Sequence, residues 1–197
     1  MRILAVSDTE SRYFYDFYEK GKLDEIDLIL ACGDLKREYL EFLVTMSGKP
    51  LLYVPGNHDD SFDENPPGGC VCIDGKLYVQ DGIRILGLGG SYRYRPGIHQ
   101  YTERQMRWRI LKVLPSVLLH GGFDILLTHA PARGLGDLEN RTHRGFECFL
   151  YLLDRFRPRY LVHGHVHRNY GHKIPQKTLR DQTTIINAYD YCVFEYE

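Results

Sequence analysis

Five short apolar runs, each followed directly by polar or charged residues, organise the chain. They cover residues 2–7, 27–32, 51–54, 124–128 and 159–162. Continuous apolar runs of this length are typical of strands buried on both faces, as in a parallel sheet. Helices are predicted between or beside them, at residues 11–20, 37–46, 102–120 and 145–156. The alternation predicts an α/β protein with a parallel sheet and right-handed crossovers.

The middle and the end of the chain predict antiparallel structure. Four strands are predicted there, at residues 70–78, 82–89, 183–188 and 191–195. The first two form a hairpin arrangement, because the Asp-Gly pairs at positions 74–75 and 81–82 are typical turn sequences. The last two close the chain as a second antiparallel portion. The whole pattern therefore favours mixed sheets.

The segment at residues 91–100 is rich in Tyr and Arg and predicts a surface loop. Interleaved aromatic and arginine side chains, here Tyr92 to Arg95, are able to stack on a nucleobase. The alternative is a solvated loop whose long side chains lie along the surface, and it is the simpler interpretation. The sequence leaves open whether this loop touches a substrate.

The length and composition predict one globular domain over residues 1–197. A chain of 197 residues is long enough for a well-buried core, and no linker divides it. The hydrophobic fraction of 43% and the charged fraction of 26% are those of a soluble protein. No apolar run approaches the roughly 18 residues of a membrane helix, and no signal-peptide segment is present. We therefore expect a cytoplasmic protein without membrane association.

The charge of the chain limits the kinds of binding partner, and its cysteines show no pattern of a metal site or disulfide. The net charge of −1 gives no general attraction to nucleic acid or to an acidic membrane. A small phosphorylated substrate remains compatible with it, because a metal site supplies its own positive charge. The five cysteines are scattered, and Cys70 and Cys72 are expected on one face of a strand. We favour the interpretation that the cysteines are small buried residues, over a zinc site or a disulfide. The sequence indicates nothing about the oligomeric state.

The five buried runs end in side chains that are able to bind metal ions. In chain order these are Asp8 with Glu10, Asp34, Asn57 with His58, His129, and His165 with His167. A single one has an ordinary explanation, such as a helix cap for Asp34 or a hydrogen-bonded buried histidine for His129. In an open α/β sheet, however, ligands bind beyond the carboxyl ends of the strands, which places all five clusters at one edge. Carboxylate, amide and imidazole donors together favour a manganese, iron or zinc centre.

These motifs resemble those of the calcineurin-like metallophosphoesterases. The matching stretches are Asp8-Thr9-Glu10, Gly33-Asp34, Gly56-Asn57-His58-Asp59, His129 and Gly164-His165-Val166-His167. They stand in the family's order and span nearly the whole chain. The resemblance implies a four-layer α/β/β/α sandwich. The lack of an obvious cap domain is similar to the small phosphodiesterase branches of the family.

Carried over by position, the resemblance implies two divalent metal ions bridged by Asp34. The first is expected at Asp8, His167 and position 10, and the second at Asn57, His129 and His165. A water activated by the two metals is expected to attack the phosphoryl group. His58 is then expected to protonate or stabilise the leaving oxygen, with Asp59 holding its imidazole.

Position 10 departs from the family pattern, which has histidine where this chain has Glu10. A carboxylate makes the first site more anionic and richer in oxygen, which favours manganese over zinc. We expect Glu10 to be a ligand of the first metal. The alternative is a weak or empty first site in a slow or inactive enzyme.

Two residues near the last motif are candidates for binding a substrate phosphate together with Asn57. His143 and Arg144 lie in the loop between two ligand-bearing strands. Arginine pairs well with phosphate oxygens, although an ordinary surface position is the simpler interpretation for both residues. Ordinary surface or partly buried positions are expected for His99, His120 and His172.

The expected function is a metal-dependent phosphoesterase that hydrolyses a small phosphodiester. A phosphomonoesterase or protein phosphatase with the same centre is the first alternative. A nuclease that acts on long polymers is disfavoured, because the chain has no basic excess. The alternative from a different class is a scaffold protein that has the same fold and has lost catalysis, and Glu10 is the feature in its favour.

Overall fold

Two β-sheets pack face to face in the computed structural model, which describes residues 1–169 and 174–197. The first sheet has the strand order β13-β1-β2-β3-β4. Its strands are β1 (Arg2–Ser7), β2 (Leu28–Ala31), β3 (Leu51–Tyr53), β4 (Val71–Cys72) and β13 (Asp190–Glu195). Strands β1 to β4 are parallel, and β13 runs antiparallel to β1.

The second sheet has the strand order β11-β12-β10-β9-β6-β5. Its strands are β5 (Leu77–Gln80), β6 (Ile83–Leu88), β9 (Ile125–Thr128), β10 (Tyr160–His163), β11 (Lys177–Arg180) and β12 (Thr183–Asn187). The inner strands β12, β10, β9 and β6 are parallel, whereas β11 and β5 pair antiparallel at the two edges. A separate two-stranded ribbon consists of β7 (Ser91–Tyr92) and β8 (Gln100–Tyr101).

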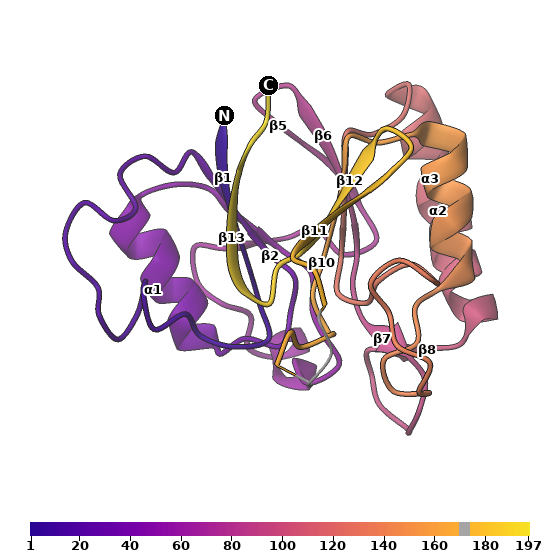
Figure 1. Cartoon of the computed structure of the whole chain (residues 1–197), viewed down its shortest axis with the longest axis horizontal. Helices are drawn as coiled ribbons and strands as arrows, with labels where there is room; N and C mark the ends of the chain where they lie inside the picture. Colours follow the sequence, from indigo (N-terminus) through magenta and orange to yellow (C-terminus); the bar gives the residue numbers. More distant parts are fainter. Residues whose placement is uncertain (170–173) are drawn as a thin grey trace.

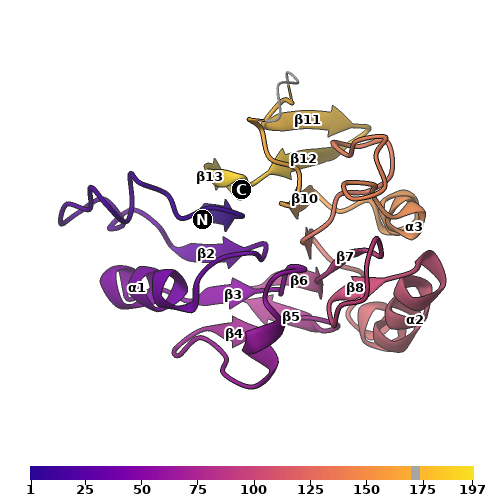
Figure 2. The same cartoon turned by 90° about the horizontal axis from the view of Figure 1, so that it is seen from below.

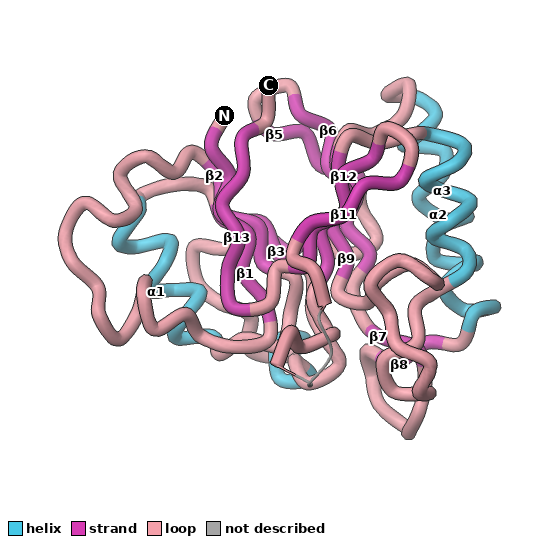
Figure 3. The backbone as a smooth tube through the Cα atoms, viewed as in Figure 1, coloured by secondary structure: helices cyan, strands magenta, loops and turns pink. Residues whose placement is uncertain are grey.

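Helices cover the outer faces of both sheets (Figure 1). Helix α1 (Arg37–Ser47) lies on the first sheet, and α2 (Glu103–Leu119) and α3 (Glu147–Phe156) lie together on the second. Figure 2 shows the same arrangement from below, with α1 on one side of the sheets and α2 and α3 on the other, and Figure 3 colours the same backbone by secondary structure. A short 3₁₀ helix, η1 (Asp60–Asp63), follows the loop after β3.

Three apolar clusters hold these layers together. The central cluster lies between the sheets and includes Ala5 and Leu30 from the first and Leu127 and Val162 from the second. One outer cluster packs α1 on the first sheet, and the other packs α2 and α3 on the second. The strands therefore bury both faces, which is why their sequences are continuous apolar runs. The predicted four-layer α/β/β/α arrangement with mixed sheets is confirmed.

The helix predicted at residues 11–20 is wrong, because this segment forms a series of turns. Half of its residues are aromatic, and aromatic side chains lose rotamer freedom in a helix. Phe14 packs edge-on against Tyr191 of β13, with ring centroids 5.0 Å apart. Tyr15 packs in the same way against Tyr39 of α1, at 5.2 Å. Residues 11–20 therefore cover the outer face of the first sheet as turns, whose aromatic rings pack individually against β13 and α1.

The prediction that the last two strands form one antiparallel portion is also wrong. Strand β12 is parallel to β10 in the second sheet, whereas β13 is antiparallel to β1 in the first. The antiparallel partner of β12 is β11, whose residues are mostly exposed and therefore lack an apolar pattern. Similarly, residues 70–78 contain β4 and the start of β5, which belong to different sheets. Of the predicted hairpin, the pair β5 and β6 is confirmed.

Three smaller expectations have mixed outcomes. Cys32, Cys148 and Cys192 are buried and unbridged, but Cys70 and Cys72 are only partly buried, and Cys70 lies outside β4. Within the described ranges, no helix has the length and hydropathy needed to cross a bilayer. His172 lies outside the described residues.

Candidate metal centre

The loops after β1, β2, β3, β9 and β10 meet at one end of the molecule. The backbone N–H of Asp8 donates to the carbonyl of Gly33 at 3.1 Å, which joins the first two loops. The two sheets are linked there as well, because the backbone N–H of His165 donates to Oδ2 of Asp8 at 2.8 Å. The parallel strands of both sheets end at this point, so the fold brings the five polar clusters together.

Three residues at these strand ends have a left-handed backbone. Their φ angles are 65° at Asp8, 56° at Asp34 and 66° at His165. Residues other than glycine adopt this conformation at an energetic cost, and such positions are concentrated at functional sites. Gly164, which precedes His165, allows the approach of the two sheets, because a Cβ atom there would overlap the side chains of Ser7 and Asp8.

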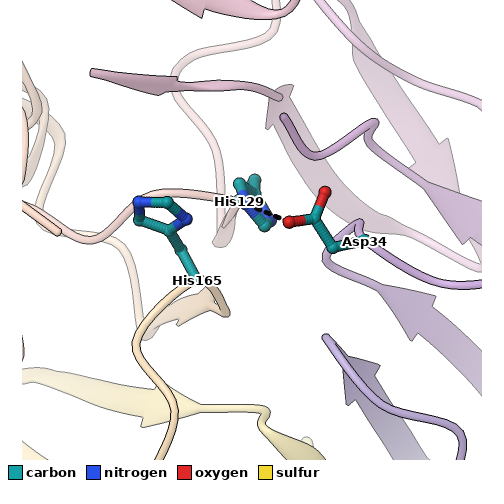
Figure 4. A group of neighbouring side chains, drawn as sticks. All are labelled: Asp34, His129 and His165. Carbon is teal, nitrogen blue, oxygen red and sulfur yellow. Dashed lines mark ion pairs between the residues drawn. The ribbon is translucent and has the colours of Figure 1, made fainter. Parts of the chain in front are cut away.

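Asp34, His129 and His165 form a compact group of potential metal ligands (Figure 4). One ligand atom from each lies within 4.8 Å of the others. Oδ2 of Asp34 is 3.4 Å from Nε2 of His129, and the two histidine rings have centroids 4.8 Å apart. Asp34 comes from the loop after β2, and the histidines come from the ends of β9 and β10, so the group spans both sheets.

Asn57 joins this group from the loop after β3. Its Oδ1 lies 3.0 Å from Nε2 of His129, and its Nδ2 donates to the hydroxyl of Tyr94 at 3.3 Å. On the other side of His129, Nδ1 lies 2.7 Å from the carbonyl of Cys32. A backbone acceptor at one ring nitrogen orients the other nitrogen toward the site, which is the usual support of a ligating histidine.

Asp8 and His167 form a second pair of donors beside the first group. Nε2 of His167 is 3.6 Å from Oδ1 of Asp8, and the ring of His167 packs against Tyr189. A cavity of about 340 Å³ opens over both groups. Its lining consists of Asp8, Asp34, Asn57, His58, Tyr94, Thr142, His143, His165 and His167.

The electrostatics of the group favour a bound cation. Burial lowers the pKa of His129, but the charges of Asp34 and Asp8 outweigh it and raise the pKa to about 9. Burial raises the pKa of Asp34, yet the neighbouring His129 leaves the pKa of this carboxyl below its ordinary value. Burial and the charge of His129 lower the pKa of His165 to about 3. The charges of Asp8 and Asp34 thus act on the neighbouring histidines, and carboxylate and imidazole donors held this close together suit a divalent ion.

Glu10 lies apart from these two groups of donors. Its Oε1 accepts a hydrogen bond from the backbone N–H of Lys36 at 3.3 Å, and its Oε2 is 3.7 Å from Nζ of Lys36. It lines an adjoining cavity of about 460 Å³, whose lining also includes Asp34 and His58. The predicted role of Glu10 as a ligand therefore has no support in its contacts.

Asp59 does not hold the imidazole of His58, which corrects the expected pairing. Its Oδ2 accepts the backbone N–H groups of Gly56 and Asp34, both at 2.7 Å. Burial and the nearby charge of Asp34 raise the pKa of Asp59 to about 6. The imidazole of His58 is exposed, and its Nδ1 lies 3.3 Å from Nη2 of Arg95. Asp59 therefore fixes the backbone of the ligand loops.

The two candidate phosphate-binding residues have different positions. His143 lines the main cavity, and its ring centroid is 5.3 Å from that of His165. Arg144 instead forms an ion pair with Glu147 at 3.2 Å and stacks over the ring of Tyr92. Because its guanidinium is paired with Glu147, the contacts of Arg144 give no support for the predicted phosphate contact.

Two residues of the segment 91–100 reach the site. Tyr94 contacts Asn57, and Arg95 contacts His58. The mixture of Tyr and Arg in this segment is the only sequence signal for them, and it does not distinguish a loop over the cavity from a loop in solvent. His120 is exposed as expected, whereas the expected surface or partly buried position is wrong for His99, which is buried.

A family model for calcineurin-like phosphoesterase matches residues 1–169 of this chain. The chain therefore belongs to the calcineurin-like phosphoesterase family. This membership agrees with the order of motifs along the strands and with the two-sheet fold.

Several curated relatives are similar over most of the chain. UPF0046 protein T07D4.2 of Caenorhabditis elegans is 43% identical over 216 residues, covering 87% of this chain and 52% of the relative. UPF0046 protein K07C11.7 of the same organism is 26% identical and covers 95% of this chain and 69% of the relative. Metallophosphoesterase domain-containing protein 1 of Homo sapiens is 23% identical over the whole chain, which spans 68% of that protein. This chain thus spans about half to two thirds of the length of these relatives.

Among solved structures, the crystal structure of TT1561 of Thermus thermophilus has a similar fold. The TM-score is 0.63 at 16% identity, over 96% of this chain and 89% of that one. At this identity the likeness supports the fold alone.

Proposed function

We propose that this protein is a metal-dependent phosphoesterase that hydrolyses a small phosphodiester in the cytoplasm. The observation that carries the proposal is the Asp34, His129 and His165 group beside a cavity of about 340 Å³. Metal ligands that border an open cavity are typical of catalytic sites, whereas structural sites are closed by protein ligands. The volume suits a small substrate, and the net charge of −1 gives no attraction to long nucleic acids.

The donor set divides into two sites that share Asp34. Asn57, His129 and His165 would hold one divalent ion, and Asp8 and His167 would hold the other. We favour manganese, with iron or zinc as alternatives, because oxygen and imidazole donors dominate and no cysteine of the described residues lines the cavity. Divalent ions at such a pair of sites supply Lewis acidity, which activates water and stabilises charge on phosphoryl oxygens.

His58 is the residue that we assign to proton transfer. Its exposed imidazole borders both the main cavity and the adjoining one, so it faces the path of a leaving group. The backbone N–H of His58 donates to Oδ1 of Asp34 at 2.8 Å, which fixes its loop against a ligand residue. Asp59 contributes by holding the same loop in place. A proton donated to the leaving oxygen typically accelerates hydrolysis about 10²- to 10⁴-fold.

The test is hydrolysis by protein that is stripped of metal and reloaded with manganese. The substrates are bis(p-nitrophenyl) phosphate and p-nitrophenyl phosphate, and the variants are His58→Ala and, as a control on the exposed end of α2, His120→Ala. Manganese-dependent turnover should fall at least about 100-fold in His58→Ala and stay unchanged in the control. A higher rate with the diester supports the phosphodiesterase.

Two results would change this proposal. A higher rate with the monoester would favour the second candidate, a phosphomonoesterase or protein phosphatase with the same centre. No turnover with any metal, by protein shown to be folded, would instead favour a scaffold protein. The observation that favours a scaffold is the contact of Glu10 with Lys36, because it leaves the first metal site without its third predicted ligand.

A further inference from the structure

The ribbon of β7 and β8 presents its connecting loop to the candidate metal centre. The ribbon follows β6 and precedes α2 in the chain, and in Figure 1 it lies below α2 and α3. Gln100 anchors the loop, because its buried side chain accepts, at Oε1, the backbone N–H groups of Tyr94 at 3.3 Å and Arg95 at 3.2 Å. Nε2 of His99 lies 3.5 Å from Oδ1 of Asp63 in η1, so the base of the loop lies beside the segment that follows Asn57 and His58.

Within the described residues, Arg95 lacks the carboxylate partner that several other arginines of this protein have. Arg109 and Arg133, for example, form ion pairs with Asp74 and Asp137. Over residues 1–169 and 174–197, Arg95 forms no ion pair with a carboxylate, and its side chain contacts the ring of Tyr94 and the imidazole of His58. Its guanidinium carries five N–H donors, so most of them remain open to a further acceptor.

Tyr94 forms a hydrogen bond with Asn57, one of the candidate metal ligands. Its hydroxyl oxygen accepts a hydrogen bond from Nδ2 of Asn57, while Oδ1 of Asn57 faces His129. This contact determines which end of the amide points toward the other metal donors. Supporting bonds of this kind orient ligands and tune metal affinity.

We infer that this loop completes the substrate site: Arg95 binds a phosphoryl oxygen of the substrate, and Tyr94 is a positioning residue for Asn57. The inference deepens the proposed function and rests on it. Arginine is well suited to phosphate oxygens because its planar group presents several parallel donors. Arg95 lies beside the cavity rather than in its lining, and its contact with His58 brings the positive charge to the rim next to the group that we assign to proton transfer.

Binding of inorganic phosphate to the manganese-loaded protein tests the role of Arg95 without requiring turnover. Isothermal titration would compare wild type, Arg95→Ala, Arg95→Lys and a control, Arg155→Ala, on the exposed end of α3. Phosphate affinity should fall about tenfold or more in Arg95→Ala, fall less in Arg95→Lys and stay unchanged in the control. Manganese affinity should be the same in all four proteins.

Tyr94→Phe tests the positioning role, with Tyr92→Phe on the same ribbon as its control. Manganese affinity should fall about tenfold in Tyr94→Phe, while the unfolding temperature of the metal-free protein stays unchanged. Phosphate affinity equal to wild type in Arg95→Ala, or no phosphate binding by wild type, would overturn the role of Arg95. Unchanged manganese affinity in Tyr94→Phe would overturn the role of Tyr94. If phosphate binds in this way but no ester is hydrolysed, the proposed function alone fails.

Discussion

The contacts of single side chains decide the roles of the polar residues after each strand. Asp59 and Glu10 lie in family motifs, but Asp59 binds backbone N–H groups and Glu10 binds Lys36. Glu10 follows Asp8, whose left-handed backbone turns the loop after β1, and Asp59 directly precedes the 3₁₀ helix η1 in the loop after β3. The residue types of the centre could be predicted from the sequence, whereas these partners could not.

Replacement of Asp59 should affect stability more than proton transfer. In Asp59→Ala, the backbone N–H groups of Gly56 and Asp34 lose their shared acceptor, which should cost about 2–3 kcal/mol of unfolding free energy. Asp59→Asn keeps a side-chain oxygen in the same place and should lose less. Urea unfolding of the metal-free proteins measures this difference. Equal stability of Asp59→Ala and wild type would contradict the role in holding the loops.

At the scale of elements, the apolar pattern predicted strands well and irregular segments poorly. The predicted strand at residues 2–7 agrees with β1, because a strand buried on both faces needs an uninterrupted apolar run. Residues 11–20 form turns, since their aromatic rings pack singly on β13 and α1. Strand β11 has no apolar pattern, because it is an exposed edge strand.

A charged pair at the opposite end of the second sheet provides a pH-dependent test at this scale. Asp124, just before β9, accepts hydrogen bonds from the backbone N–H of Arg84 in β6 at 2.8 Å and from its guanidinium at 2.9 and 2.6 Å. Burial raises the pKa of Asp124, but the bonds from Arg84 outweigh it, so the pKa lies below its ordinary value. A carboxyl with a lowered pKa stabilises the fold above its unfolded pKa, and this stability is lost as the pH falls through the folded value.

Asp124→Asn should therefore be less stable than wild type at pH 7, by about 2 kcal/mol. The difference should persist down to about pH 4, the ordinary pKa of aspartate, and shrink below it. Denaturant unfolding of both proteins at a series of pH values measures the difference. A constant difference through this range would show that the charge of Asp124 contributes nothing.

At the scale of the whole molecule, the candidate centre joins the two sheets. Asp8, Asp34 and Asn57 come from the first sheet, and His129, His165 and His167 come from the second. An ion shared by these residues would cross-link the two halves of the sandwich. Ligands that bind only the folded state raise its stability in proportion to the logarithm of their concentration.

Removal of metal should therefore lower the unfolding temperature. Manganese at about 100 times its dissociation constant should add about 2.7 kcal/mol to the free energy of unfolding. His129→Ala should lose most of this gain, while His120→Ala should keep it, because His120 is exposed at the end of α2. Scanning calorimetry with and without manganese measures the effect. An unfolding temperature independent of manganese would argue against a metal that joins the sheets.

The sequence by itself determined the succession of the buried strands along the chain, the residue types at their ends and the membership of the family. These are local properties, because an apolar run and the polar motif after it are adjacent in the chain. Only the tertiary structure decided that β12 and β13 belong to different sheets and that Arg95 contacts His58. Such contacts join residues far apart in sequence, and they depend on loop directions that no local hydrophobic pattern encodes.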